Sequence, residues 1–373
     1  MRVGSGGARR AHVEIGIAMK FESSMTSRHA HARVWAVVLL AMSVFPVACA
    51  EDDEPESKPH EKGDHDKPAK PELVPDPVVP TAASFSAIWG SSATDVWACG
   101  SDGVIAHYDG KQISLIESGT KVRLLAVHGS GPDDVWFVGE MGTTLHWDGD
   151  AITPVSLIPD ETLLGVWSNG PEDVWAIGFF PQDRVGVLRH WTGGAWDELL
   201  VAPAASLWEI WSSGPDDVWV VGTNLDLAGL VLHASGNEVS LMEFDGTPLR
   251  GVWGVDPDDV WLLPYNSPIQ HWDGSSFTLS DASSETPMLG MWGAGADDVW
   301  AVGLVGTILH YDGDTWEPSD SGVIDTLWSV WGAASDDVWA AGGEGTLLRW
   351  RGDEWTKLEV GVELPSADGD STN

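Results

Sequence analysis

Acidic pairs that precede a Val-Trp dipeptide are the first residues whose types and spacing suggest chemistry. They include Asp133 with Asp134, Asp216 with Asp217, and Asp297 with Asp298. Paired carboxylates can bind a divalent cation or act as general acid and base. Symmetric copies stand on a ring, however, whereas metal ligands converge on one ion at about 2.0 to 2.6 Å. We therefore interpret these acids as turn residues that accept backbone N–H bonds, and we expect no catalytic residue, metal or cofactor.

A histidine recurs downstream of the acids, and Arg349 takes its position in the last copy. The six histidines are His107, His146, His190, His233, His271 and His310. Histidine is a common metal ligand. Strands lie about 4.8 Å apart within a sheet, so a third strand stands well out from the axis and neighbouring copies cannot share an ion. We expect each histidine to be hydrogen-bonded to a nearby turn.

These residues belong to a sequence repeat that occurs in seven copies. The Trp of its Asp-Val-Trp triplet falls at Trp97, Trp136, Trp175, Trp219, Trp261, Trp300 and Trp339. A period near forty residues is typical of one four-stranded propeller blade. Most residues of the repeat therefore have a structural role, and they indicate little about what the protein binds.

Each copy divides into four short apolar runs separated by Gly, Asp, Asn, Ser or Pro. In the sixth copy we expect strands at Met288 to Trp292, Val299 to Val302 and Thr307 to Tyr311, and a fourth from Trp316. The links are short, which suits hairpins and excludes crossover helices. The sequence predicts an all-β fold, a seven-bladed β-propeller of four-stranded antiparallel blades over residues 82–361.

Tryptophan is concentrated in this region, and Trp35 is the only one of 23 outside it. Three sets occupy fixed positions of the repeat, so we interpret them as packing between blades, with a sugar-stacking surface as the alternative. Trp208 and Trp328 fall outside these sets. We expect these two to be the exposed aromatic residues.

The string DVWAVG…GTILHYDGDTW, from Asp298 to Trp316, resembles the BNR and Asp-box class of β-propeller repeats. It is similar to the propellers of photosystem II assembly factors, and more distantly to those of sialidases and sortilin-type receptors. The resemblance covers residues 84–360 and implies the fold. The Asp-Gly turn of that class matches Asp109-Gly110, Asp148-Gly149, Asp273-Gly274 and Asp312-Gly313, but a complete Asp box is absent.

Sialidase chemistry would require an arginine triad with a Tyr and Glu pair. From residue 81 onward the arginines are Arg123, Arg184, Arg189, Arg250, Arg349 and Arg351, and Tyr265 is the only tyrosine outside a repeat position. We therefore expect a non-enzymatic protein. A glycoside-active enzyme and a scaffold with no small ligand remain as alternatives.

Charge restricts the partners. Of 57 acidic residues and 19 Lys and Arg residues, 12 and 10 lie in residues 1–80, so residues 81–373 carry 45 and 9 and a net charge of −36. Such a surface repels nucleic acid and anionic headgroups. We expect no nucleic-acid partner.

The N-terminal region predicts export. Val34 to Ala48 is apolar, follows Arg28 and Arg33, and is too short to span a bilayer, as in a signal peptide. Val47-Ala48-Cys49 resembles a bacterial lipoprotein cleavage site, which implies a lipid on Cys49. We expect residues 1–48 to be the signal peptide, with translation starting at Met19 or Met25. The mature protein would be lipid-anchored to the bacterial envelope at the outer membrane.

Residues 49–81 form a charged, Pro-rich stretch that we expect to be a disordered tether, and residues 362–373 a disordered tail. Cys99 replaces a core Val of the repeat, so we expect a buried thiol and no disulfide.

A binding site is expected where the copies differ. The links between the second and third strands are longer at 179–186 and 223–229, and the fifth copy has lost its Gly there. We expect a ligand face at the channel mouth built from Phe179, Phe180, Arg184, Asn224, Asp226 and Tyr265. The sequence thus favours a binding module for a protein or glycan at the cell envelope.

Overall fold

The computed structural model describes residues 83–155, 160–200, 204–235, 238–244, 246–280, 282, 284 and 286–358. The chain divides into two compact units, residues 1–70 and 71–373, and every described residue lies in the second. The predicted signal peptide, the lipid site at Cys49, the tether and the tail lie outside the described residues and stay predictions. Within the described ranges, no helix has the length and apolarity needed to cross a bilayer.

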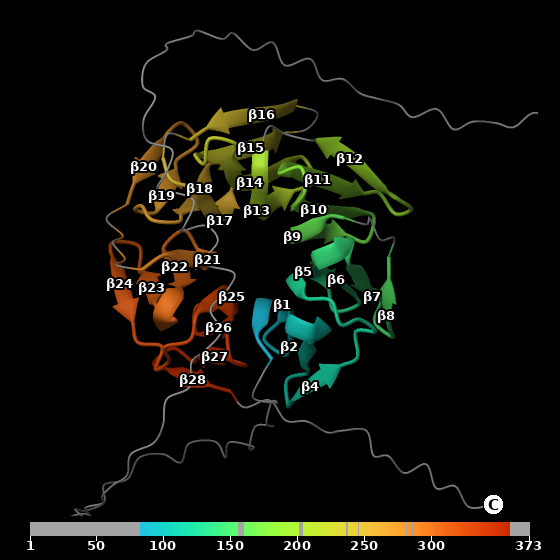
Figure 1. The fold of residues 1–373 in the computed structure, drawn as a ribbon. Helices are drawn as coiled ribbons and strands as arrows, with labels where there is room; N and C mark the ends of the chain where they lie inside the picture. Colours follow the sequence, from blue (N-terminus) through green and yellow to red (C-terminus); the bar gives the residue numbers. More distant parts are fainter. Residues whose placement is uncertain are drawn as a thin grey trace, which may run out of the picture. The chain divides into compact units, whose positions relative to one another are not determined.

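The described strands form seven four-stranded antiparallel sheets, the blades of a propeller (Figure 1). Strands A to D are numbered in chain order within each blade. Strands A are β1 (Phe85–Ser92), β5 (Leu124–Gly131), β9 (Thr162–Gly170), β13 (Ala204–Gly214), β17 (Leu249–Asp256), β21 (Met288–Gly295) and β25 (Leu327–Ala334). Strands B are β2 (Asp95–Gly100), β6 (Asp134–Gly139), β10 (Asp173–Phe180), β14 (Asp217–Asn224), β18 (Asp259–Pro264), β22 (Asp298–Gly303) and β26 (Asp337–Gly342).

The outer half of each blade is formed by strands C and D. Strands C are β3 (Ile105–Tyr108), β7 (Thr144–Trp147), β11 (Val185–Trp191), β15 (Gly229–Ser235), β19 (Gln270–Trp272), β23 (Ile308–Tyr311) and β27 (Leu347–Trp350). Strands D are β4 (Ile113–Ile116), β8 (Ile152–Pro154), β12 (Trp196–Leu200), β16 (Glu238–Glu243), β20 (Phe277–Leu279), β24 (Trp316–Ser319) and β28 (Trp355–Lys357). The predicted seven-bladed propeller is confirmed.

Each blade consists of four consecutive strands, with strand A nearest the centre and strand D at the rim (Figure 1). The blade of β1 to β4 therefore meets the blade of β25 to β28 without sharing a strand with it. We call this contact the closing seam. In the described part of the chain each hydrogen bond across it involves a side chain, as in the bond from the Ile88 N–H to the Ser329 hydroxyl at 3.2 Å, which makes those side chains important for closure.

Tryptophans of strands B fill the gaps between blades, as the sequence predicted. Each is buried, and six of the seven rings pack against an aromatic residue of the next blade, whereas Trp175 packs among aliphatic residues such as Leu230 and Leu232. Ring centroids lie 5.3 Å apart for Trp97 and Trp147, and 5.2 Å apart for Trp339 and Tyr108 across the closing seam. Large aromatic rings bury about 150 to 250 Å² each, so these contacts supply much of the core.

Tryptophans of strands A fit against glycines of the following blade. The contact recurs at five seams: Trp89 on Gly129, Trp211 on Gly254, Trp253 on Gly293, Trp292 on Gly332, and Trp331 on Gly90. A Cβ on any of these glycines would lie 2.5 to 2.8 Å from the Cη2 atom of the indole. At these five seams the glycine is therefore required by the close approach of a ring, whereas at the seam of β9 and β13 Ser212 takes the glycine position opposite Trp167.

The seam between β5 and β9 replaces both partners of this contact. His128 stands in the tryptophan position and Ser168 in the glycine position. The Ser168 backbone N–H donates to Nδ1 of His128 at 3.0 Å, and His128 stacks on Trp167 with centroids 4.0 Å apart. The smaller ring leaves room for the serine side chain, so the two changes compensate each other.

A β-bulge recurs at one position of every strand A. In β1, for example, Phe85 and Ala87 pair with β2 but Ser86 between them does not, and Trp89 follows three residues after Ser86. The same residue, three positions before the strand A Trp or His, is unpaired in the other six blades. A bulge re-aims the side chain of its extra residue. The seven residues at this position, which we call the bulge ring, are Ser86, Leu125, Leu164, Trp208, Arg250, Leu289 and Trp328.

The predicted long links of the third and fourth blades are in fact extended hairpins. Phe179 and Phe180 belong to β10 and pair with Gly186 and Val185 of β11. Likewise, β14 runs to Asn224 and β15 begins at Gly229. The interpretation of 179–186 and 223–229 as loops was wrong, because the added residues continue the ladder before the chain turns.

Candidate functional site

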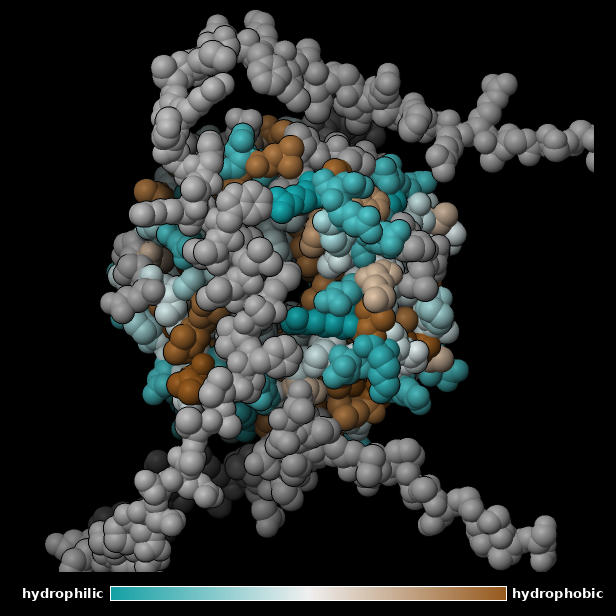
Figure 2. All heavy atoms as spheres, in the orientation of Figure 1, coloured by the Kyte–Doolittle hydropathy of each residue, from teal (hydrophilic) through white to brown (hydrophobic). Residues whose placement is uncertain are grey.

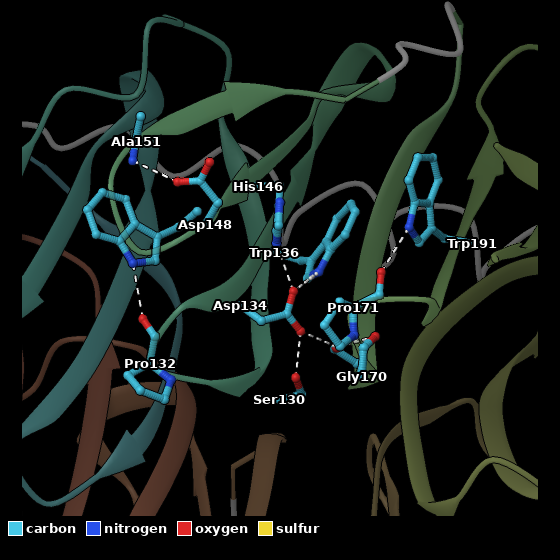
Figure 3. A network of polar contacts seen from close by, with 12 residues as sticks. Ser130, Pro132, Asp134, Trp136, His146, Asp148, Ala151, Gly170, Pro171 and Trp191 are labelled. Carbon is cyan, nitrogen blue, oxygen red and sulfur yellow. Dashed lines mark hydrogen bonds and ion pairs between the residues drawn. The ribbon is translucent and has the colours of Figure 1, made fainter. Parts of the chain in front are cut away.

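Strands B and C of six blades share a group of Asp, His and Trp, and Figure 3 shows the group of the second blade. In four of these blades Nε1 of the Trp donates to the Asp, whereas Nε1 of Trp219 and of Trp261 is buried without a partner among the described residues. Nε2 of the strand C histidine lies 2.6 to 2.7 Å from Oδ1 of the aspartate that begins strand B. The histidine ring stacks on the strand B tryptophan, with centroids 3.9 to 4.3 Å apart. The same geometry recurs around the ring, so the group serves the blade itself.

In the second blade the aspartate of this group is Asp134. It accepts bonds from His146, from Nε1 of Trp136 at 2.9 Å and from Oγ of Ser130 at 2.6 Å. Burial opposes ionisation of Asp134, but these bonds and one from Ser168 outweigh it and lower its pKa to about 2. The second acid of the pair thus binds side chains, which corrects the expectation that it accepts backbone N–H bonds of the turn.

Backbone N–H bonds go instead to the acids of the Asp-Gly turns. Oδ1 of Asp148 accepts from the N–H groups of Asp150 and Ala151 at 3.0 and 2.9 Å. In the adjoining turn, Nε1 of Trp147 donates to the Pro132 carbonyl at 3.1 Å (Figure 3). Within the ranges that the structure describes, no group of three or more His, Cys, Asp or Glu residues gathers where it could hold a metal ion. Cys99 is fully buried, as predicted.

Arg349 takes the histidine position in the seventh blade, at the closing seam. Its Nε and Nη2 donate to both oxygens of Asp337 at 2.6 and 2.7 Å, and its guanidinium lies over Trp339. It also reaches the first blade, where it lies 5.2 Å from the Tyr108 ring and donates to the Ala93 carbonyl at 3.4 Å. The longer side chain therefore keeps the contacts of the histidine and adds two across the seam.

The bulge ring lies on the innermost strands, and all seven of its residues keep partial exposure. Because strand A lies nearest the axis, we interpret this exposure as facing the central channel. The flanking positions are apolar or small except at Glu209, whereas the ring itself carries Ser, Leu, Trp and Arg. A position with fixed backbone and variable side chain is where a repeat protein can adapt to a ligand.

Arg250, Trp208 and Tyr265 form a cluster in this channel. The Arg250 guanidinium lies 3.7 Å from the centroid of Trp208 and 5.0 Å from that of Tyr265. Nε1 of Trp208 donates to the Thr223 hydroxyl at 3.2 Å, which fixes the indole. Burial lowers the pKa of Arg250 to about 10, an effect that Tyr265 partly offsets, so the guanidinium stays charged at neutral pH.

Glu209 follows Trp208 on β13 and is half-buried. Burial raises the pKa of Glu209 to about 7, although the Ile210 backbone N–H donates to it at 3.3 Å. The usual carboxyl pKa is about 4.5, so in the window between these values the folded protein holds a proton that the unfolded chain has lost. Stability contributed by Glu209 is therefore lost as the pH rises through 7.

We expect Glu209→Gln to raise the free energy of unfolding by about 1 to 2 kcal/mol at pH 8 and to change it little at pH 5. This change in the free energy of unfolding is smaller than the full pKa shift of Glu209 implies, because the Glu209 side chain keeps contact with solvent. Urea unfolding from pH 5 to 8.5 measures it, with the exposed Glu344→Gln as control. Equal effects of Glu209→Gln at both pH values would contradict the assignment.

The residues of the predicted ligand face lie in three consecutive blades, at the end formed by the B–C links. Tyr265 joins the cluster of Arg250 and Trp208, whereas Oδ1 of Asn224 accepts the N–H groups of Asp226 and Ala228 at 2.9 Å and serves its own turn. Arg184 closes the β10–β11 turn, its N–H donating to the Phe180 carbonyl at 2.9 Å. Phe179 and Phe180 are half-buried, and Arg184 and Asp226 are exposed.

The B–C and D–A links lie at the same end of the blades and form what we call the link face. Three B–C links carry the 3-10 turns η2 (Ser101–Gly103), η3 (Glu140–Gly142) and η4 (Leu304–Gly306). Large apolar residues are exposed on this face: Met141 65%, Leu225 62%, Val305 61% and Ile324 82%. In Figure 2 brown hydrophobic and teal hydrophilic residues meet near the centre, where grey atoms do not cover the surface.

Comparison with protein families gives no match, and neither does comparison with curated proteins. YCF48 from Cyanidioschyzon merolae is similar in structure, with a TM-score of 0.59 and 16% identity over 73% of this chain and 97% of that chain. YCF48 bound to a D1 peptide gives 0.57 and 17%, over 74% and 94%. The WD40 propeller domain of Doa1 gives 0.59 and 14%, over 73% and 93%. These identities establish the fold alone.

Sequence reasoning singled out Trp208 and Trp328 but missed Arg250 and Glu209. Both tryptophans are half-buried members of the bulge ring, so they are less exposed than expected. The signal for the missed residues was present, because aligning the copies on the strand A tryptophan places Arg250 in the same column as Trp208. The sequence does not reveal the β-bulge at this position, and the bulge changes the direction of the side chain.

Proposed function

We propose that this protein is a protein-binding module whose partner docks on the link face, over the mouth of the channel. The observation that carries the proposal is the bulge ring, where an invariant backbone presents Trp208, Arg250 and Trp328 to the channel. Aromatic residues and Arg are the types most enriched at binding hot spots. Exposed Met141, Leu225, Val305 and Ile324 add apolar area around them.

The opposite face is less suited to this role. Its A–B turns carry exposed acids in six blades: Asp133, Glu172, Asp216, Asp258, Asp297 and Asp336. Like charges on a rim increase solubility and restrict this face to cationic partners. That a YCF48 propeller is seen with a D1 peptide shows that this fold can hold a polypeptide. Placement at a bacterial envelope rests on the predictions for residues 1–48 and Cys49.

Two alternatives have specific requirements. A glycan would stack on an open aromatic face, but the Trp208 ring is already covered by Arg250 at 3.7 Å, which favours a protein partner. Glycoside hydrolysis needs two carboxyl groups about 5 to 10 Å apart. In the parts of strands A beside the bulge ring that the structure describes, Glu209 is the one acidic residue.

Site-specific photo-crosslinking tests the proposal in the full chain. Benzoylphenylalanine is placed at Met141, Leu225 or Val305 on the link face, and at Asp133, Asp216 or Asp297 on the opposite face. In the producing cells we expect one protein to be captured from the first three positions and not from the others. Capture from the acidic face, or the absence of any captured protein, would refute the proposed face.

A further inference from the structure

Arg250 carries a charge for which the described part of the chain provides no counter-charge. Its Nε is buried without a hydrogen-bond partner, and no hydrogen bond or ion pair joins its guanidinium to another described residue. The arginines within strands C differ, since Arg189 bonds Glu161 and Glu198, and Arg349 bonds Asp337. A half-buried, unpaired guanidinium costs free energy unless a ligand compensates it.

The geometry around Arg250 leaves one direction open for such a ligand. Cζ of Arg250 lies 3.7 Å from the centroid of Trp208 and 5.0 Å from that of Tyr265, so the rings occupy one side of the guanidinium, and the N–H groups of a guanidinium lie in its own plane. Carboxylates bind guanidinium in that plane with two parallel hydrogen bonds. The aromatic support also holds the guanidinium in place, which reduces the entropy that binding would cost.

From this geometry we infer that Arg250 binds the C-terminal carboxylate of a partner polypeptide whose last residue is apolar. The inference rests on the proposed function and names the part of the partner that enters the channel. Leu164, Leu289 and Trp328 occupy the same bulge position in three other blades, so the ring carries apolar side chains together with its one cation. These apolar side chains and the charged Arg250 match a C-terminus that has an apolar last side chain and a negatively charged carboxylate.

A chain terminus fits better than an acidic side chain within a chain. Because the bulge ring encircles the axis, a polypeptide can reach Arg250 from the link face by entering end first. A continuous chain that presented Asp or Glu there would have to bring both flanking segments into the ring. The C-terminus needs space for one strand only, and its carboxylate lies at the tip.

Matched peptide libraries test this inference. Fluorescein-labelled hexapeptides ending in Leu or Phe, randomised at the other positions, are prepared with a free C-terminal carboxylate and as amides. Fluorescence polarisation with the full-length protein should show about tenfold or greater preference for the acids, as a charge-assisted bidentate pair implies. Equal affinity for acids and amides, or no binding of either, would overturn the inference.

Variants assign the preference to Arg250. Arg250→Gln should abolish it, and Arg250→Lys should reduce it because Lys keeps the charge but loses the fork. Arg351→Gln removes the same charge from a C–D turn at the acidic face and should leave the preference intact. An unchanged preference in Arg250→Gln would refute the assignment, and if that variant fails to fold, Arg250→Lys decides.

A third library separates chain ends from acidic side chains. Amidated hexapeptides with one internal Glu should bind no better than the other amides, and binding equal to the free acids would refute the C-terminal assignment. Failure of this inference is distinguishable from failure of the proposed function. If acids and amides bind equally while crosslinks still form from the link face, the docking face stands and the role of Arg250 falls.

Discussion

Replacing Arg349 with Met is expected to lower the free energy of unfolding by about 3 kcal/mol or more. Arg349 is buried at 6% exposure, and it provides the only side-chain hydrogen bonds to Asp337 in the described residues. Its removal leaves a largely buried carboxylate without a partner. It also removes the contacts with Tyr108 and Ala93 across the closing seam.

Two variants separate these effects. Arg349→His restores the residue of the other six blades and pairs with Asp337 again, so we expect it to recover more than half of the loss. His146→Met alters the same position in the second blade, where Asp134 keeps Ser130, Trp136 and Ser168, and should cost only about 1 kcal/mol. Urea unfolding measures all three. If Arg349→His is as unstable as Arg349→Met, the seam contacts dominate and the paired charge matters little.

The closing seam shows what the sequence could and could not predict. Seven copies with fixed tryptophans and short links dictated the blades, because the repeat period, the alternation of strands and the turn residues all agree. The sequence also showed that Arg349 departs from the pattern. It could not show why, since the two partners across the seam, Ala93 and Tyr108, are about 250 residues away in the chain and meet Arg349 only when the ring closes.

The channel was predicted less well for a similar physical reason. Side-chain direction in a strand follows strict alternation until a bulge shifts it, and nothing in the residues around Arg250 or Trp208 marks the bulge. The B–C links looked more variable, so the candidate face was assigned to them. The structure joins one of those residues, Tyr265, to the bulge ring through Arg250. The candidate site therefore combines Tyr265, which the sequence analysis selected, with Arg250, which it did not.

The compensating pair His128 and Ser168 should behave as a unit when it is changed back to the residues of the other blades. His128→Trp alone brings an indole against the Ser168 side chain. At five seams a Cβ in that place would lie 2.5 to 2.8 Å from the indole, but Ser212 already stands opposite Trp167 at the seam of β9 and β13, so we expect a loss of only about 1 to 2 kcal/mol. Ser168→Gly alone removes the bond from the Ser168 hydroxyl to Asp134 at 3.0 Å and should cost about 1 kcal/mol. The double variant should be about 1 kcal/mol more stable than the sum of the single changes predicts.

The stability difference between the double variant and the original protein should also depend on pH. Burial lowers the pKa of His128 to about 3, with Asp134 partly opposing it, whereas the unfolded chain has the ordinary value of about 6.5. The unfolded state therefore takes up the proton first, and stability is lost as the pH falls from 6.5 toward 3. The double variant has no histidine there, so its stability relative to the original protein should increase between pH 7.5 and pH 4.5. Strictly additive single changes, or a difference that does not vary with pH, would show that His128 and Ser168 are independent and that the seam tolerates either ring.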